Sequence, residues 1–211
     1  MKLVTINRII ILLLLVLLIY YYLYDGTSSF QSYINNNDYK VRSGSTNMRE
    51  IKANLLANLY NKLEKIVDKL KNDSSLANDE AVQRLIKNWD RGITIKETGF
   101  FENDAAYVIN KQYMSVCLVN FCDKKSCTNI NSLENLNLLT YVGIHELAHI
   151  MSIEIGHGTE FKINFRFLLN YAKDMKYFDP LLNKEIPLYI DLYNLNTPDN
   201  FCGVSIINSI S

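Results

Sequence analysis

The 211-residue sequence has no excess of charge of either sign, because Lys plus Arg and Asp plus Glu both number 22. Phosphate binding rests chiefly on Lys and Arg, so nucleic acid is not expected as the main partner. Long asparagine runs are also missing, since only Asn35–Asn37 comes close to one, and this argues against a prion-like tract. No internal repeat is visible. A hydrophobic fraction of 48% at this length fits one domain with a packed core plus an appendage.

Histidine is scarce, and the three residues of this type all lie in one short window, at 145, 149 and 157. Two histidines four residues apart share one face of a helix, so His145 and His149 can both bind one metal ion. Glu146 lies beside the first of them and can reach a metal-bound water without itself binding the metal. The pattern H-E-x-x-H thus predicts two zinc ligands and a general base.

A catalytic zinc also needs a third protein ligand and one open position for water. His157 is the favoured third ligand, because Gly156 can adopt a positive φ and turn the chain back after the helix. Glu154 and Glu160 are the competing ligands. Two other interpretations are a purely structural zinc site, which would want a fourth protein ligand, and a helix with surface histidines that bind no metal.

A hydrophobic segment lies near the N-terminus, where every residue of Ile9–Leu23 is apolar or tyrosine. A bilayer-spanning helix needs about 20 residues, and we expect residues 1–24 to form a transmembrane anchor. A cleaved signal peptide and a buried core helix are the alternatives. Because Lys2 and Arg8 precede the segment and Asp25 follows it, the positive-inside rule predicts a single-pass membrane protein with a cytosolic N-terminus. The remaining chain would then lie on the lumenal or exterior side of a host or virion membrane.

The chain has four cysteines, an even number that permits two disulfides in a protein exposed to an oxidising compartment. Free thiols and a metal site are the alternatives, although C-x4-C-x4-C is not a common zinc spacing. The sequence does not determine the pairing. The four residues are Cys117, Cys122, Cys127 and Cys202.

The spacing of apolar residues predicts an α+β domain. Steps of three and four residues indicate helices over 48–71, 79–89, 132–155 and from Thr159 onward. Alternating or β-rich stretches indicate strands at 93–96, 106–109 and 113–121, with a turn at 110–112. The resulting sheet would be small and mainly antiparallel. Residues 25–47 are polar and are expected to form a linker before the domain.

The motifs also resemble a known family. HELAH followed by GHGTEF resembles the zinc metallopeptidases of the SprT-like and WLM group, in which H-E-x-x-H is followed after a spacer by Gly-His-Gly-x-Glu-Phe. The longer segment YVGIHELAHIMSIEIGHGTEFKINFRFLLNYA is similar to WLM-type metallopeptidases encoded by large DNA viruses. The resemblance covers about 105–205 and is strong only between 141 and 169. It implies a compact zincin-like α+β fold, Zn²⁺ on His145, His149 and His157, and Glu146 as the catalytic base.

The organisation predicted from the sequence is an anchor at 1–24, a linker at 25–47, a zincin-like metallopeptidase domain at 48–205 and a tail at 206–211. Such a protein would be a membrane-anchored zinc metallopeptidase acting on a protein or peptide substrate. One alternative is a non-enzymatic viral or membrane structural protein that keeps zinc as a fold staple. Another is a hydrolase of non-protein amides, because the H-E-x-x-H motif alone does not determine which amide bond is hydrolysed.

Two supporting roles stay open among several residues. A second donor to the developing oxyanion would come from one of three tyrosines, Tyr171, Tyr177 or Tyr189. The ligand imidazoles would be oriented by Glu154, Glu160 or Asn164, and the other interpretation of each is a solvated surface group.

Overall fold

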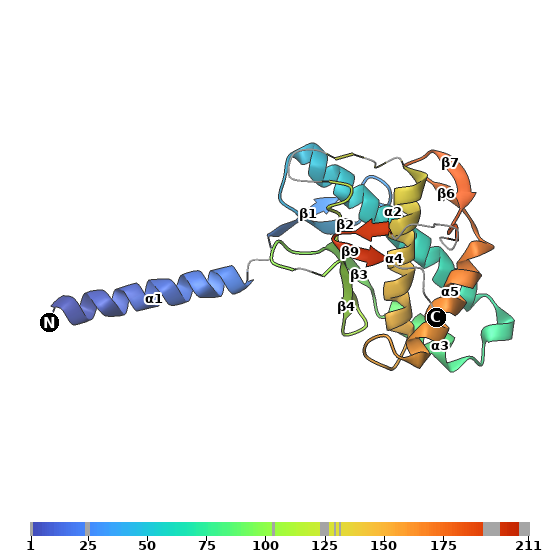
Figure 1. The fold of residues 1–211 in the computed structure, drawn as a ribbon, viewed down its shortest axis with the longest axis horizontal. Helices are drawn as coiled ribbons and strands as arrows, with labels where there is room; N and C mark the ends of the chain where they lie inside the picture. The colour runs from blue at the N-terminus through green and yellow to red at the C-terminus, as the bar shows by residue number, and fades with distance from the viewer. Residues whose placement is uncertain are drawn as a thin grey trace.

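The computed structural model describes residues 2–23, 26–102, 104–122, 127–128, 130, 132–191 and 199–206. It shows an α+β protein, as the sequence predicts, in which small sheets lie around a core of helices (Figure 1). The helices are α1 (Lys2–Leu23), α2 (Thr46–Lys71), the 3-10 turn η1 (Ser74–Leu76), α3 (Glu80–Asp90), α4 (Leu133–Met151) and α5 (Thr159–Lys173). The strands are β1 (Thr27–Gln31), β2 (Asp38–Arg42), β3 (Thr94–Glu97), β4 (Ala106–Ile109), β5 (Tyr113–Val116), β6 (Lys176–Asp179), β7 (Lys184–Pro187), β8 (Asp199–Phe201) and β9 (Val204–Ile206).

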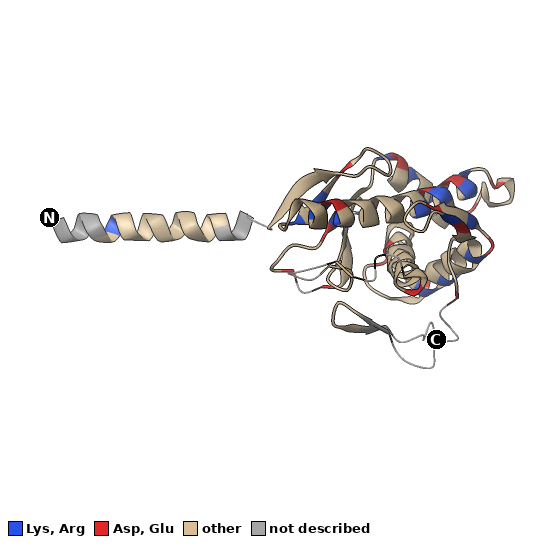
Figure 2. Ribbon diagram, turned by 90° about the horizontal axis from the view of Figure 1, so that it is seen from above, with Lys and Arg blue, Asp and Glu red and all other residues tan. Residues whose placement is uncertain are grey.

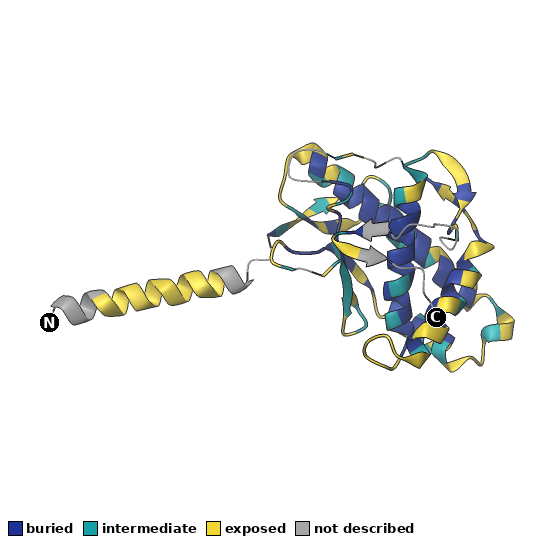
Figure 3. Ribbon diagram, viewed as in Figure 1, coloured by how far each residue is buried: buried dark blue, intermediate teal, exposed yellow. Residues whose placement is uncertain are grey.

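The core forms where α2 and α4 pack against each other. Both helices are mostly buried along their length (Figure 3). Gly143 of α4 permits a close approach, because a Cβ atom there would lie 2.5 Å from Cδ1 of Leu59 on α2. Leu59 is itself buried, so the missing side chain at Gly143 sets the spacing of the two helices.

The central sheet has the strand order β3-β5-β4. The expected hairpin is confirmed: β4 and β5 pair antiparallel around a turn in which Asn110 and Lys111 have φ of 53° and 57°. Strand β3 pairs parallel with β5, whereas β1–β2, β6–β7 and β8–β9 are antiparallel hairpins. Pairing among the described strands is therefore mainly antiparallel, with one parallel exception inside the central sheet.

Residues 25–47 were expected to be a linker, but most of them form the β1–β2 hairpin, which packs on α2. Ser32 donates a hydrogen bond from its hydroxyl to Oδ1 of Asn54 at 2.7 Å. Glu97 of β3 accepts from the backbone N–H of Arg42 at 2.6 Å and from Nζ of Lys52 at 2.8 Å. The polar residues of this segment thus satisfy buried partners and make the hairpin part of the domain.

Charged residues of both signs are interspersed along the helices of the domain (Figure 2). Besides the buried ion pair of Lys52 and Glu97, a second one is formed by Nζ of Lys62 on α2 and the carboxylate of Asp179 on β6, which lie 3.0 Å apart. Asn58 also donates to this carboxylate at 3.0 Å, and the hydroxyl of Tyr177 donates to Asn58 at 2.8 Å. Buried charges need such partners, and this network ties the β6–β7 hairpin to α2.

The N-terminal helix α1 extends away from the rest of the molecule (Figure 1), and its described side chains are exposed (Figure 3). In the part of the chain that the structure describes, no helix combines the length and the apolar character that crossing a membrane requires. The predicted transmembrane anchor and the predicted single-pass membrane localisation are therefore wrong. The apolar run Ile9–Leu23 falls short of the roughly 20 residues that a bilayer demands, and Asn7 and Arg8 precede it.

Both pairs of cysteines form disulfides, which answers the question of pairing that the sequence left open. Cys117 bonds to Cys202, and Cys122 bonds to Cys127. The first bond joins the chain just after β5 to the turn between β8 and β9, so it holds the C-terminal hairpin on the domain. The backbone N–H of Cys202 also donates to Oδ1 of Asn120 at 3.1 Å. Beyond residue 206, the predicted tail at 206–211 lies outside the described residues.

Candidate metal centre

The candidate site is built on α4 and on the loop that joins it to α5. Ser132 caps α4, because its hydroxyl accepts a hydrogen bond from the backbone N–H of Asn135. The helix ends at Met151, four residues earlier than the sequence suggested, and His145 and His149 both lie on it. Helix α5 packs against α4 and brings Phe161 to within 4.8 Å of His145, ring centre to ring centre. Aromatic rings therefore form one wall of the site.

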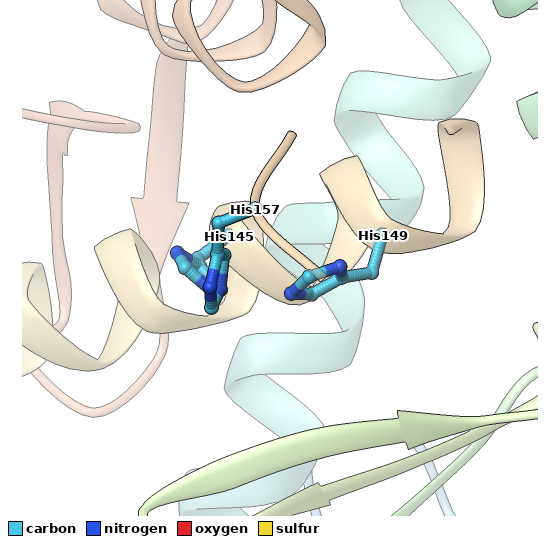
Figure 4. Close-up of side chains that lie close together, drawn as sticks. All are labelled: His145, His149 and His157. Atoms are coloured by element: carbon cyan, nitrogen blue, oxygen red, sulfur yellow. The ribbon is translucent and has the colours of Figure 1, made fainter. Parts of the chain in front are cut away.

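The three imidazoles converge, as the sequence predicts (Figure 4). One potential ligand atom from each of His145, His149 and His157 lies within 4.8 Å of the others. The Nε2 atoms of His145 and His157 are 2.9 Å apart. These three residues could hold a metal ion. Among the described residues, this is the one group of three or more His, Cys, Asp or Glu side chains whose ligand atoms lie close enough to share a metal ion.

The local environment keeps two of these imidazoles neutral in the metal-free protein. Burial, followed by the neighbouring histidines, lowers the pKa of His145 to about 3. Burial, His157 and Lys111 lower the pKa of His149 to about 4. Because metal ions bind the neutral imidazole, the ligand nitrogens need not lose a proton near neutral pH.

Glu146 is a buried carboxylic acid that lacks an ordinary structural role. Its side chain is 3% exposed, and no hydrogen-bond partner for Oε2 is found in the part of the chain that is described. Burial raises the pKa of Glu146 to about 8. A buried oxygen without a partner costs free energy, so this carboxyl group is an exception that the packing of the helix does not explain.

The structure also separates the three candidates for the third ligand. Gly156 has a φ of 87°, which turns the chain back as predicted and brings His157 to the other two histidines. Glu160 instead accepts hydrogen bonds from the backbone N–H groups of Ile153 and Glu154, at 2.8 and 3.1 Å. Of the three candidates, only His157 belongs to the converging group.

Two of the three candidate oxyanion donors are engaged elsewhere. The hydroxyl of Tyr171 donates to Asp73 at 3.1 Å, and the hydroxyl of Tyr177 donates to Asn58 in the buried network. Tyr189 is buried, with its ring 6.3 Å from that of Tyr141, which lies one helical turn before His145.

Asn164, a candidate for orienting an imidazole, instead supports the end of α4. It donates to the hydroxyl of Ser152 at 2.8 Å, and Ser152 donates in turn to the carbonyl of Ala148. Sequence reasoning missed three further residues that contact this helix end, namely Lys111, Asn88 and Arg84. Each is far from α4 in the sequence, so no local signal marks it.

Comparison with known proteins identifies two viral relatives over part of the chain. It is 32% identical over 79 residues to "Uncharacterized protein 042R" of Invertebrate iridescent virus 3, a match that covers 37% of this chain and 45% of the relative. It is also 32% identical over 78 residues to "Uncharacterized protein 136R" of Invertebrate iridescent virus 6, covering 37% and 41%. The chain thus spans less than half the length of these relatives. No family model matches the chain, and no solved structure matches it.

Proposed function

We propose that this protein is a zinc-dependent metallopeptidase that hydrolyses peptide bonds of a protein or peptide substrate. The observation that carries the proposal is the position of Glu146, a buried carboxyl group without a partner for Oε2 among the described residues, beside three converging imidazoles. This set of groups matches the needs of a hydrolytic zinc site, namely nitrogen ligands and a proton acceptor that does not bind the metal.

The ligand set fits zinc better than magnesium or calcium. Nitrogen donors suit zinc, whereas magnesium and calcium prefer oxygen ligands. Nitrogens bound tetrahedrally at about 2.0–2.1 Å from zinc lie about 3.3 Å from one another. The separations between the histidine nitrogens bracket that value: one pair is 2.9 Å apart, and all three nitrogens lie within 4.8 Å of one another. His145, His149 and His157 would hold the ion and leave a fourth position open.

When bound, zinc would supply a Lewis acid and lower the pKa of coordinated water toward about 7. The carboxylate of Glu146 would accept the proton of the attacking water and return it to the leaving amine. Burial raises the pKa of Glu146 in the metal-free chain, and a bound cation would favour its ionised form, which in this buried position would be a strong proton acceptor. Phe161 and Phe165 pack against His145 and keep that imidazole in a fixed orientation.

The alternative of a non-enzymatic protein with zinc as a fold staple explains less. A staple gains nothing from a buried carboxyl group next to a ligand, and that group costs free energy. A staple would also want a fourth protein ligand, whereas the described residues bring three into the group. Two disulfides and an extensive core already stabilise the domain.

Substitution of the proposed base tests this function. The full chain should bind one zinc per molecule and cleave members of a broad peptide library. Glu146→Gln should keep the zinc and lose roughly 10²–10⁴-fold in cleavage rate, because it removes the proton acceptor but keeps the shape. Metal analysis and a fluorogenic library assay measure the two properties separately.

The matched control is Glu185→Gln, a surface carboxylate on β7 that pairs with Lys176 at 3.3 Å, and it should leave both properties unchanged. Full activity of Glu146→Gln would refute the mechanism. A parent chain that binds zinc but cleaves no peptide would refute peptidase activity, and turnover of non-protein amides alone would reassign the substrate.

A further inference from the structure

The end of α4 that carries the second ligand is held by three side chains, two from α3 and one from the turn between β4 and β5. The last four carbonyls of a helix lack partners within it. Here Ala148 O accepts the N–H of Ser152 at 3.0 Å. The carbonyls of His149, Ile150 and Met151 each accept from a side chain, and the donors are Lys111, Asn88 at 3.1 Å and Arg84 at 2.6 Å.

A second set of bonds fixes the loop that carries the third ligand. Glu160, in the first turn of α5, accepts through Oε2 from the N–H groups of Ile153 at 2.8 Å and Glu154 at 3.1 Å. These bonds close the loop at its base, because they join its first residues to the helix that follows it. Ile155, Gly156 and His157 then form its apex.

One guanidinium group links the two sets of bonds. Nη1 of Arg84, on α3, donates both to the carbonyl of Met151 and to Oε1 of Glu160, at 2.6 and 2.9 Å. The same Glu160 carboxylate therefore contacts Arg84 with one oxygen and the loop backbone with the other. The end of the helix that carries His149 and the base of the loop that carries His157 are joined through these two side chains.

We propose that Arg84 and Glu160 are positioning residues that place His157 at the metal, by clamping the base of its loop to the end of the ligand helix. The proposal rests on the metal site that we propose above, but not on peptide hydrolysis. Glu160 acts on His157 through the backbone between them and does not bind the metal.

An ordinary surface ion pair would not have this effect. The side chains of Arg84 and Glu160 are 25% and 27% exposed, and a pair at such a site adds little to stability. The loop, however, has few other constraints near its apex: Ile155 is fully exposed, and Gly156 is in the left-handed region. Loss of the clamp should therefore change the position of His157 much more than the stability of the domain.

The test measures metal binding by the full chain, without reference to hydrolysis. Glu160→Ala and Arg84→Ala should each weaken Zn²⁺ affinity by about 10–100-fold, the range typical for residues that support a ligand. Competition with a chromophoric chelator gives the affinity. In the Co²⁺-loaded protein, the visible spectrum of both variants should shift toward that of His157→Ala. Arg84 carries no metal-binding lone pair, so its effect cannot arise from loss of a ligand.

The matched control is Glu102→Ala. Like Glu160, Glu102 accepts hydrogen bonds from a basic side chain and from the backbone. The donors are Nζ of Lys96 at 3.2 Å and the N–H of Gly99 at 2.7 Å, and the side chain of Glu102 is 25% exposed. Glu102→Ala and Glu160→Ala should lower the melting temperature of the metal-free chain by similar amounts. Only Glu160→Ala should weaken zinc binding.

A double variant decides whether the effect passes through His157. In the His157→Ala background, adding Glu160→Ala should change zinc affinity less than about twofold, because the group that the clamp positions is already gone. The proposal is overturned if Glu160→Ala keeps the parent's zinc affinity and Co²⁺ spectrum, or if its full effect persists without His157. If zinc affinity falls in the clamp variants as expected but the parent chain cleaves no peptide, the proposed function is refuted and this inference stands.

Discussion

Gly156 is the residue whose backbone conformation decides where His157 lies. Its φ of 87° belongs to the left-handed region, and a Cβ atom added there would meet nothing within 4 Å. Gly156→Ala therefore introduces backbone strain of about 1–2 kcal/mol and no clash. We expect the loop to relieve this strain by moving His157, and zinc affinity to fall by roughly 3- to 30-fold in a chelator competition assay.

Gly92, between α3 and β3, provides the matched control for that prediction. Its φ is 91°, and a Cβ atom there would also meet nothing within 4 Å. Gly92→Ala should lower the free energy of unfolding about as much as Gly156→Ala but leave zinc affinity unchanged. Equal zinc affinity in the two variants would show that the turn at Gly156 does not position His157.

At the scale of single residues, the sequence predicts the cluster of three histidines well because its signal is local. His145 and His149 share a helix face by their spacing alone, and a glycine before His157 suffices to suggest the turn. Arg84 and Glu160 could not be assigned in this way. Their contact joins α3 to α5, and only the packing of these helices against α4 brings the two side chains together.

The packing of α4 on α2 gives a prediction at the scale of elements. Gly143→Ala would place a Cβ atom 2.5 Å from Cδ1 and 3.3 Å from Cγ of Leu59, in a buried contact. Overpacking of this kind costs about 1–3 kcal/mol, whereas the gain in helix propensity from glycine to alanine is about 1 kcal/mol. We therefore expect a net loss of up to about 2 kcal/mol in the free energy of unfolding, measured by denaturant titration.

A double-mutant cycle shows whether the contact with Leu59 is the cause. Leu59→Ala should cost about 2–5 kcal/mol in the parent chain but clearly less in the Gly143→Ala chain, because the shortened side chain makes room for the new methyl group. Additive losses would mean that α4 is not held at its distance from α2 by this contact.

Elements with a regular apolar spacing were the ones that the sequence predicted best. Helices α2 and α3 begin and end within about two residues of their predicted bounds, and the turn at Asn110 and Lys111 joins β4 to β5 as expected. The β1–β2 hairpin was missed because it is polar and is stabilised by partners on α2 and β3. The parallel pairing of β3 with β5 was missed for a similar reason, since pairing between distant strands leaves no local pattern.

At the scale of the whole molecule, the predictions that were wrong concern the N-terminal segment. Its composition suggested a membrane anchor, but none of the described helices is both long and apolar enough to cross a bilayer. For the disulfides, in contrast, the sequence permitted the correct number of bonds but did not determine the pairing. Only the fold brings Cys117 to Cys202, which is 85 residues away in the sequence. Long-range pairing depends on the completed core and therefore could not be read from the sequence.

The titratable groups of the candidate metal centre should also make the stability of the whole metal-free chain depend on pH in both directions. His145 and His149 have folded-state pKa values of about 3 and 4, below the usual value near 6.5, so in acid the unfolded chain binds more protons and stability falls as the pH drops below about 6.5. Glu146 has the opposite effect. Its folded-state pKa of about 8 exceeds the unfolded value of 4.5, so the stability that it contributes is lost progressively as the pH rises from 4.5 through 8, and the loss levels off above that.

Stability of the metal-free chain should therefore be greatest near pH 6.5–7. Between there and pH 8 the loss should approach about 1.4 kcal/mol per pH unit, the value for one proton, and above pH 8 it should level off. Denaturant unfolding between pH 5 and 9 in the presence of a chelator measures the profile. In Glu146→Gln the alkaline loss should be much smaller, whereas the acid loss should remain because both histidines are intact. An equal alkaline loss in the parent and Glu146→Gln would show that Glu146 does not hold its proton in the folded chain, and would remove the argument that burial makes it a strong proton acceptor.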